Sequence, residues 1–564
     1  MEKTIRALIA EGKKLFNKNQ YDDAISSLDE AYNLLQNNQP HDTQQKCDIQ
    51  FWLGRCYLEK ALQTGDEAQT QSWFDEAINH HEEQLKLASQ LTDEQKKIEE
   101  QGNAQHWLGQ CYLEKALQTG DETQAQSWFK KAIKHHKEEL ELASQLTDEQ
   151  KKIEEQQIAL FWRGLCYFEL ANQMEKSGKC SEKIFQKYFS LKESLIAKKL
   201  EIDTATNKKL SKMERYITTI LATLYITPSE LGEIPLAHYA SPKVCSLLFG
   251  LSFDLNKENH KKPKQISKMR MGSASYMNDP MEGKSLFELL SLHDLDLQNK
   301  TDFNAYNNAF FSCFTSRIND LNQFRLYGKE DGVEASGCCL VFNKDGKWLV
   351  NSDISMAYKL LKNGGFYNEN TKINNLKKNK SDFPLYQVAY IAYLDEYLDE
   401  YIKKYKYHFK LKSNQKNFGI YLQCIGSSDT WHKIRLEKLQ KGLHDLIEYI
   451  RKNNLLIEEK KSLEYIRYLF KDFAFRDEEE FRLLTITKLG DSELEYCSNT
   501  NSVYMPYAEI CNMVSEVILG VNFEKTNSKN KVEVFRYHMK KRWPKVKVSH
   551  SSLPINANPP YKPD

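Results

Sequence analysis

The sequence predicts an α+β multidomain protein: an N-terminal α-solenoid of helical hairpins, followed by a mixed α+β domain with a helical insertion. Three observations support this prediction. The chain has 564 residues, more than the about 250–300 that one hydrophobic core usually serves. A stretch that begins at Phe51 returns almost unchanged 55 residues later, at His106, and a decayed third copy begins at Phe161. Beyond about residue 228, short runs of alternating apolar and polar residues replace the helical pattern.

Each copy of the 55-residue repeat predicts two long helices joined by a turn. A Thr followed three residues later by a Gln, such as Thr92 and Gln95, is typical of a capping box at a helix start. The Thr-Gly-Asp turns at 64–66 and 119–121 supply a glycine that ends one helix and an aspartate that caps the next. Each hairpin has an apolar face that it cannot bury alone, so neighbouring copies must stack.

The repeat pattern W-x-G-x-C-Y followed by W-F-x-x-A-I resembles the tetratricopeptide repeat, and residues 4–35 look like an ordinary copy. The period of 55 exceeds the 34 usual in that family, so longer helices are expected. The resemblance covers about residues 1–200 within a predicted domain of residues 1–227. It implies a concave surface that binds a protein or peptide. The alternative is a spacer or a dimerisation arm.

Composition and charge exclude several classes of function. Lys and Arg total 79 against 78 for Asp and Glu, so nucleic acid is not an expected partner. No apolar run reaches 18 residues, and the N-terminal residues lack the apolar core of a secretory signal. The 12 cysteines form no C-x-x-C pair. We therefore expect a cytoplasmic protein without a transmembrane segment, or one delivered by a secretion system that reads no signal peptide.

The paired histidines at 80–81 and 135–136 are not expected to bind a metal. Adjacent helical residues point about 100° apart, which does not suit chelation. We expect these histidines on a solvated polar face, and no metal site is predicted.

The second half is predicted to begin after a final helix at 204–226. Residues 228–268 contain helix-breaking prolines and a basic segment and are assigned to a linker. A catalytic α+β domain is predicted at residues 269–553, with a helical insertion at about 395–473, and residues 554–564 are expected to be a flexible tail. The predicted strands are 267–276, 308–316, 335–342, 386–393, 480–487, 514–520, 531–539 and 545–551.

A pair of carboxylates is the sharpest chemical signal in this half. If residues 478–484 form a strand, Glu478, Glu480 and Arg482 lie on one face of it. Like charges side by side cost stability unless they are solvated, paired or used in function. The alternative is an ordinary polar strand face, balanced by Arg476 and Arg482. P-loop, G-x-G-x-x-G, G-x-S-x-G and kinase motifs are absent from the sequence.

Residues from about 245 to 553 resemble a bacterial domain family that has no assigned function. The resemblance consists of N-D-P at 278–280, C-F-T at 313–315, an aromatic-x-x-Tyr segment at 324–327, E-x-E-x-R at 478–482 and the segment VSEVILG at 514–520. Three segments of this half, in the same order, also resemble the R-S-E signature of ADP-ribosyltransferases. Here the middle motif is Ser-Cys-Phe-Thr-Ser rather than Ser-Thr-Ser.

The second resemblance implies a set of residues that bind NAD as a substrate. Arg270 would hold the phosphates and ribose of NAD through charge-assisted hydrogen bonds. Ser312, Thr315 and Ser316 would orient the site. Tyr327 would stack on the nicotinamide ring.

The same resemblance implies two catalytic residues. Glu480 would hold the nicotinamide ribose hydroxyl and stabilise the oxocarbenium-like transition state. Glu478 would act as the base toward an acceptor side chain. The expected function is an ADP-ribosyltransferase-like enzyme that modifies a protein recruited by the repeats, a layout that suits a bacterial effector. The alternatives are a non-catalytic adaptor with a ligand-binding α+β domain, or another transferase or hydrolase that uses the same carboxylates.

Overall fold

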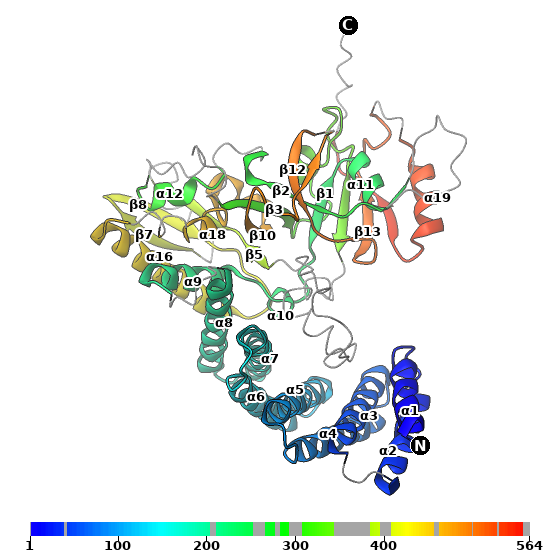
Figure 1. Ribbon diagram of the computed structural model, residues 1–564. Helices are drawn as coiled ribbons and strands as arrows, with labels where there is room; N and C mark the ends of the chain where they lie inside the picture. The colour runs from blue at the N-terminus through cyan, green and yellow to red at the C-terminus, as the bar shows by residue number, and fades with distance from the viewer. Residues whose placement is uncertain are drawn as a thin grey trace. The chain divides into compact units, whose positions relative to one another are not determined.

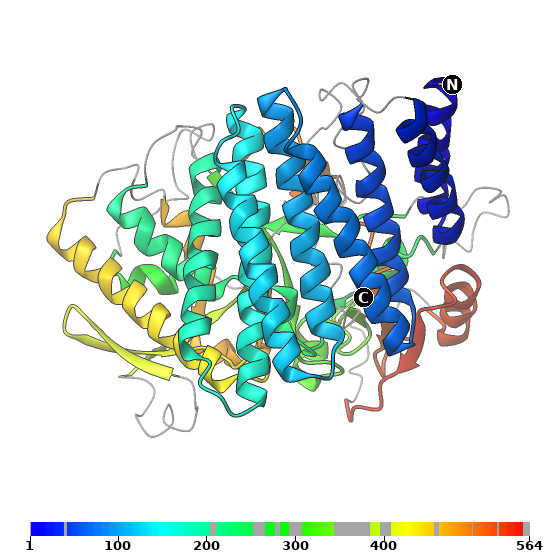
Figure 2. The same ribbon diagram turned by 90° about the horizontal axis from the view of Figure 1, so that it is seen from below.

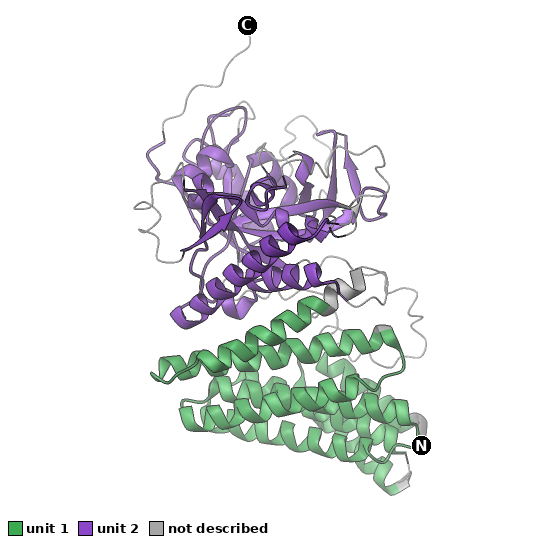
Figure 3. Ribbon diagram, turned by 90° about the vertical axis from the view of Figure 1, so that its left-hand side faces the viewer, with its two compact units in different colours: residues 1–209, 354–375 green, residues 210–353, 376–564 purple. Residues whose placement is uncertain are grey.

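The computed structural model describes residues 2–38, 42–203, 210–251, 266–276, 282–292, 307–342, 384–394, 408–455, 459, 462–498, 500–526 and 530–555. The chain forms two compact units, residues 1–209 with 354–375 and residues 210–353 with 376–564 (Figure 3). The first unit is helical and the second combines sheets with helices, which confirms an α+β multidomain protein. Among the described residues, no helix is long and apolar enough to cross a membrane.

Eight consecutive helices make up the described part of the first unit, and they run side by side in Figure 2. Each helix packs on the one that follows it, from α1 to α8. Asp66, Asp93, Asp121 and Asp148 are the N-caps of α4 to α7, and each carboxylate accepts backbone N–H groups of the first turn. The helices are α1 (Glu2–Phe16), α2 (Tyr21–Asn38), α3 (Thr43–Gln63), α4 (Glu67–Ala88), α5 (Glu94–Gln118), α6 (Glu122–Ala143), α7 (Glu149–Lys176) and α8 (Glu182–Asp203).

The cap expected at Thr92 is therefore shifted by one residue, to Asp93. Both residue types are good N-caps, and the carboxylate of Asp93 reaches the N–H groups of Gln95 and Lys96. The aspartates of the two Thr-Gly-Asp turns cap the next helix as the sequence predicted.

The second histidine of each pair lies in the core rather than on a polar face. His81 and His136 are fully buried. A Cβ atom on Gly54 would lie 2.5 Å from His81 Nε2, and one on Gly109 would lie 2.4 Å from His136 Nε2. The missing side chain of each glycine therefore makes the space that the imidazole of the next helix fills. The expectation of solvated histidines was wrong for these two residues.

The second unit is built on a sheet whose order is β11-β12-β2-β3-β1-β4-β13-β14, with β10 paired to β3 and to β5 (Figure 1). Because β10 pairs with β3 along its whole length, β2 and β1 share the other edge of β3. The strands are β1 (Ala237–Ala240), β2 (Arg270–Ser273), β3 (Asn307–Thr315), β4 (Cys338–Phe342), β5 (Leu385–Gln387), β10 (Glu480–Lys488), β11 (Glu495–Cys497), β12 (Ser502–Pro506), β13 (Val514–Leu519) and β14 (Lys547–His550).

A second sheet has the order β7-β8-β6-β9, and α16 and α9 pack against each other beside it. Its strands are β6 (Ala389–Tyr393), β7 (His408–Ser413), β8 (Lys416–Tyr421) and β9 (Phe470–Asp472). The helices of the second unit are α9 (Lys212–Leu224), α10 (Pro228–Leu231), α11 (Pro242–Leu248), α12 (Ser285–Leu289), α13 (Leu321–Leu326), α16 (Asp429–Lys452), α18 (Glu464–Arg467) and α19 (Val532–Arg542), with 3₁₀ helices η1 (Ala274–Tyr276) and η3 (Phe473–Glu478).

Four segments differ from the sequence prediction. The helix expected at the end of the repeats, α9, belongs to the second unit, because it packs on α16. The predicted linker at 228–268 contains β1, which pairs with both β3 and β4; four residues are too short a run to show periodicity. Within the predicted helical insertion, residues 408–421 form the hairpin of β7 and β8, and α16 is its long helix. Residues 532–542 form α19 instead of a strand.

The large sheet places different side chains on its two faces. Phe481, Leu483 and Phe314 belong to the main apolar core on one face. On the other face, Phe324 of α13 packs with Ala237 and Tyr239 in a smaller core. Ala237 pairs directly with Thr315, and Thr315 pairs with Glu480, so this second face also carries the first residue of β10.

Candidate functional site

A tight turn places the two predicted catalytic carboxylates. Glu478 is the last residue of η3, and Glu479 has a left-handed backbone with φ of 46°. β10 begins only at Glu480. Glu480 and Arg482 therefore share a strand face as predicted, but Glu478 does not lie on that strand. The prediction was wrong here because three consecutive glutamates carry no signal for the left-handed residue that ends the 3₁₀ helix.

Arg482 and Lys471 hold the carboxylate of Glu480 from two sides. Arg482 donates from Nε to Glu480 Oε1 at 2.6 Å and from Nη2 to Oε2 at 2.9 Å. Lys471 Nζ lies 3.3 Å from Glu480 Oε2 and 2.6 Å from Glu478 Oε2. Lys471 is on β9, so this ammonium joins the two carboxylates across the two sheets. All four side chains are buried.

The guanidinium of Arg482 is also bound on its outer edge. Glu282 accepts from Nη1 at 2.6 Å and from Nη2 at 3.1 Å, and the carbonyl of Tyr468 accepts from Nη1 at 2.6 Å. The next residue is Gly283, with φ of +73°, where a Cβ atom would lie 2.8 Å from the ring of Tyr468. Glycine at 283 therefore lets the chain bring Glu282 against the strand.

Tyr327 connects this buried cluster to solvent. Its side chain follows α13 and is 39% exposed, and its hydroxyl donates to Glu478 Oε1 at 2.5 Å. Thr315 Oγ1 donates to the backbone carbonyl of Glu478 at 2.6 Å, and Ser316 Oγ donates to the carboxylate of Glu479. Thr315 thus binds the backbone of Glu478, and Ser316 binds the side chain of the next residue, Glu479. Tyr327 binds the side chain of Glu478 itself.

The pKa values of Glu478 and Glu480 shift in opposite directions. Burial opposes ionisation of Glu480, but Arg482 and Lys471 outweigh it and lower the pKa of Glu480 to about 2. For Glu478, burial together with the charge of Glu480 outweighs Lys471 and raises its pKa. Three carboxylates, including Glu282, face two cations, so one negative charge is in excess. Of the paired Glu478 and Glu480, Glu478 is therefore the one that keeps its proton to higher pH.

Two of the predicted NAD-binding residues lie apart from this cluster. Ser312 pairs with Leu483, so its side chain is on the core face. Its buried hydroxyl has no hydrogen-bonding partner among the described residues. Arg270 is exposed, and its guanidinium stacks on the ring of Tyr504 at 3.9 Å. By register, Arg270 is on the same sheet face as Glu480, across β3. The N-D-P segment at 278–280 lies outside the described residues.

The sequence analysis missed three contributors to the site. Lys471 and Glu282 hold the charges of the cluster, and Tyr390 on β6 accepts a hydrogen bond from the backbone N–H of Glu480 at 2.9 Å. The second sheet brings Lys471 and Tyr390 side by side, because β6 and β9 pair with Tyr390 opposite Lys471. No spacing in the sequence could indicate this pairing.

A cysteine thiol also lies beside the cluster, and burial disfavours its ionisation. Cys313 pairs with Arg482 across β3 and β10. Burial, together with the negative charge of Glu480, raises the pKa of the Cys313 thiol well above its ordinary value. Proton transfer at Glu478 is therefore better supported than thiolate chemistry.

The chain was compared with known proteins. No protein-family model matches the sequence, and a search of curated proteins found no match.

Proposed function

We propose that the second unit is an ADP-ribosyltransferase-like enzyme that uses NAD as a substrate. One observation carries the proposal: the three segments of the R-S-E pattern come from strands β2, β3 and β10, which are neighbours in one sheet. Arg270, Thr315 and Glu480 occupy positions on the same face of that sheet. Segments more than 200 residues apart in the chain thus lie on strands that share one neighbour, β3, and this supports the proposal.

In the proposed reaction, the bond between the nicotinamide nitrogen and C1′ of its ribose breaks, and nicotinamide leaves with the bonding electrons. C1′ then forms a bond with a nucleophilic atom of the acceptor, whose proton passes to Glu478. Ionised Glu480 supplies negative charge near the developing oxocarbenium. Its position is fixed by Arg482 and Lys471, and Arg270 would bind the phosphates.

The first unit is proposed to recruit the acceptor protein. Two observations support a tetratricopeptide-like solenoid: the repeat occurs in two nearly identical copies, and each helix packs on the next. In such a solenoid, stacked hairpins form an extended binding surface. The acceptor would then be chosen by the repeats and modified by the second unit.

A second candidate function is a non-catalytic binding module on the same scaffold. The observation that favours it is the complete pairing of Glu480: both of its oxygens are bound by Arg482, and one also by Lys471. A carboxylate held in this way stabilises the junction of the two sheets without any reaction.

Transfer of label from NAD tests the two candidates against each other. Full-length protein is mixed with cell lysate and NAD labelled in its adenosine moiety, and labelled proteins are detected after denaturation. We expect labelling by the wild type, loss of labelling in Glu478→Gln, and retention in Glu334→Gln, which removes an exposed carboxylate paired with Arg325. Equal labelling by wild type and Glu478→Gln, or none by a folded wild type, would contradict the enzyme proposal and leave the binding module.

A further inference from the structure

A histidine–histidine–glutamate cluster is buried in the second repeat of the first unit. His106 is on α5, and His136 and Glu139 are one turn apart on α6. His106 Nδ1 lies 2.9 Å from Glu139 Oε1, and His136 Nδ1 lies 2.7 Å from Glu139 Oε2. One ligand atom from each residue lies within 4.8 Å of the other two. All three side chains are at most 3% exposed.

The neighbouring repeat shows that this cluster is not needed for the fold. The copies at 51–101 and 106–156 differ at ten positions. Two of these differences are Phe51 for His106 and Gln84 for Glu139, while His81 corresponds to His136. The first copy buries Phe51, His81 and Gln84 in the same places. Two of the few changes between the copies therefore complete one set of metal-binding side chains.

Hydrogen bonds within the cluster alone do not account for it. They leave a buried carboxylate and buried imidazole nitrogens without full compensation. Burying a carboxylate in place of an amide costs free energy unless its charge is compensated. The Nε2 atoms of both His106 and His136 are buried, and no described residue forms a hydrogen bond with either of them. In the first copy, the amide of Gln84 donates to Glu100 at 3.4 Å. In the second, the equivalent pair is Glu139 and Glu155, two carboxylates that line one pocket.

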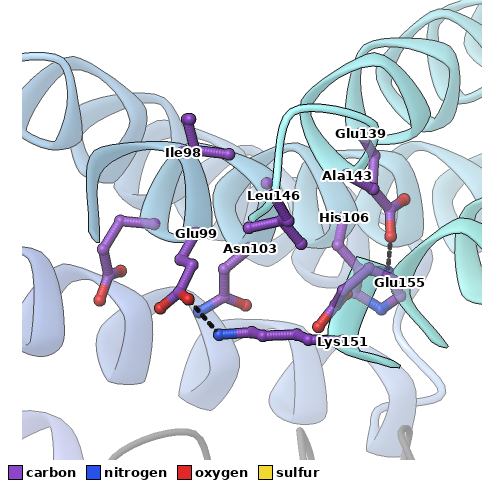
Figure 4. Close-up of a pocket in the computed structure, with 11 residues that line it drawn as sticks. Ile98, Glu99, Asn103, His106, Glu139, Ala143, Leu146, Lys151 and Glu155 are labelled. Atoms are coloured by element: carbon purple, nitrogen blue, oxygen red, sulfur yellow. Dashed lines mark hydrogen bonds and ion pairs between the residues drawn. The ribbon is translucent and has the colours of Figure 1, made fainter. Parts of the chain in front are cut away.

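The pocket gives the cluster a route to solvent. It lies between α5, α6 and α7, and His106, Glu139 and Glu155 line it together with Asn103 (Figure 4). Its remaining charges include Glu99, which is paired with Lys151, and Glu100. Asn103 Oδ1 is buried there and accepts no hydrogen bond from the part of the chain that the structure describes. The surroundings of the cluster are thus rich in carboxylate and amide oxygens.

We propose that His106, His136 and Glu139 bind a divalent transition-metal ion of the zinc type. Two imidazoles and one carboxylate are typical ligands of zinc, which binds them at about 2.0–2.2 Å. Tetrahedral bonds of that length place ligand atoms about 3.3 Å apart. His106 Nδ1 and Glu139 Oε1 are 2.9 Å apart and need to separate by less than about half an ångström. The ligand atom of His136 already lies within 4.8 Å of the other two. The pocket leaves the fourth coordination position of the ion to a water molecule. That water can donate hydrogen bonds to Asn103 and Glu155.

The test is metal binding by the full-length chain after removal of adventitious metal with a chelator. Equilibrium dialysis against Zn²⁺ at concentrations near that of the protein should load one ion per chain and raise the unfolding temperature. Replacing Zn²⁺ with Co²⁺ should give the visible absorption of a tetrahedral site. The double variant His106→Phe, Glu139→Gln should lose both the ion and the absorption. It should still fold, because the first repeat packs with these side chains.

A matched control separates this site from surface histidines. His444→Gln removes a histidine whose side chain is 65% exposed, and it should retain the ion. The single variant Glu139→Gln serves if the double variant fails to fold, and it should weaken binding and abolish the tetrahedral Co²⁺ spectrum. Failure of the wild type to bind one ion at these concentrations, or the same stoichiometry and spectrum in a folded His106→Phe, Glu139→Gln variant, would overturn the proposal. Both outcomes are independent of any reaction with NAD.

Discussion

Glu480→Gln is expected to destabilise the second unit, because it removes the negative charge that both Arg482 and Lys471 bind. The glutamine keeps the shape of the side chain but cannot accept two charge-assisted hydrogen bonds from the guanidinium. Arg482 would keep Glu282 as its remaining carboxylate partner. Lys471 would keep Glu478, whose raised pKa makes it the weaker anion.

The size of the effect follows from two routes. The pKa of Glu480 falls from 4.5 to about 2, which corresponds to about 3 kcal/mol of preference for the ionised carboxylate in the folded state. Removing one partner of a buried ion pair costs roughly 3–5 kcal/mol. The pKa route therefore agrees with the lower end of the ion-pair range, about 3 kcal/mol. For a unit of this size, a loss of about 3 kcal/mol lowers the midpoint of thermal unfolding by roughly 4 °C.

The assay is calorimetry of wild type, Glu480→Gln and Glu334→Gln at several pH values. Because the pKa of Glu480 is depressed, its contribution is present above about pH 4.5 and is lost as the pH falls toward 2. The difference between wild type and Glu480→Gln should therefore shrink on acidification. Glu334→Gln should change stability by less than about 1 kcal/mol, as an exposed pair does. A Glu480→Gln variant as stable as Glu334→Gln at neutral pH would refute the reasoning.

Three further predictions concern single positions. Because the pKa of Glu478 is raised, ionisation of Glu478 destabilises the folded state as the pH rises. Glu478→Gln should therefore gain stability relative to wild type from acidic to neutral pH. A difference in denaturation midpoints that does not change with pH would contradict this. Tyr327→Phe should cost about 1 kcal/mol in urea denaturation, through loss of the hydrogen bond to Glu478, and unchanged stability would argue against that bond. Gly109→Ala should cost about 1–3 kcal/mol of stability, because the new methyl group displaces the ring of His136. Gly120→Ala, where the added methyl group meets open space, should change stability by less than about 1 kcal/mol. Equal denaturation midpoints of the two variants would contradict the close packing.

The helices of the first unit were predictable because the repeated sequence presents the same signals more than once. The turns at 64–66 and 119–121 lie between helices as expected. Burial of His81 and His136 was not predictable from their own helix. It depends on the glycine of the preceding helix that each imidazole covers, and the sequence pattern within one helix does not identify that neighbour.

In the second unit, alternation predicted β3, β4, β10 and β13, whose runs are long enough to show a period of two. Alternation also predicted that Glu480 and Arg482 share a face. Lys471 and Glu282 could not be predicted, because they reach Arg482 and Glu480 from β9 and from the residue before Gly283. Sequence spacing describes neighbours on one element, whereas this cluster is assembled by contacts between elements.

Release of nicotinamide from NAD by the purified full-length chain tests the central claim most directly. The claim is that Glu478, held by Tyr327 and Lys471, is the proton-exchanging group of an NAD-consuming site. The account predicts release by the wild type and its loss in Glu478→Gln, with the variant as folded as the wild type by calorimetry. Release that persists unchanged in Glu478→Gln, or a folded wild type that neither binds NAD nor releases nicotinamide with lysate present, would contradict it.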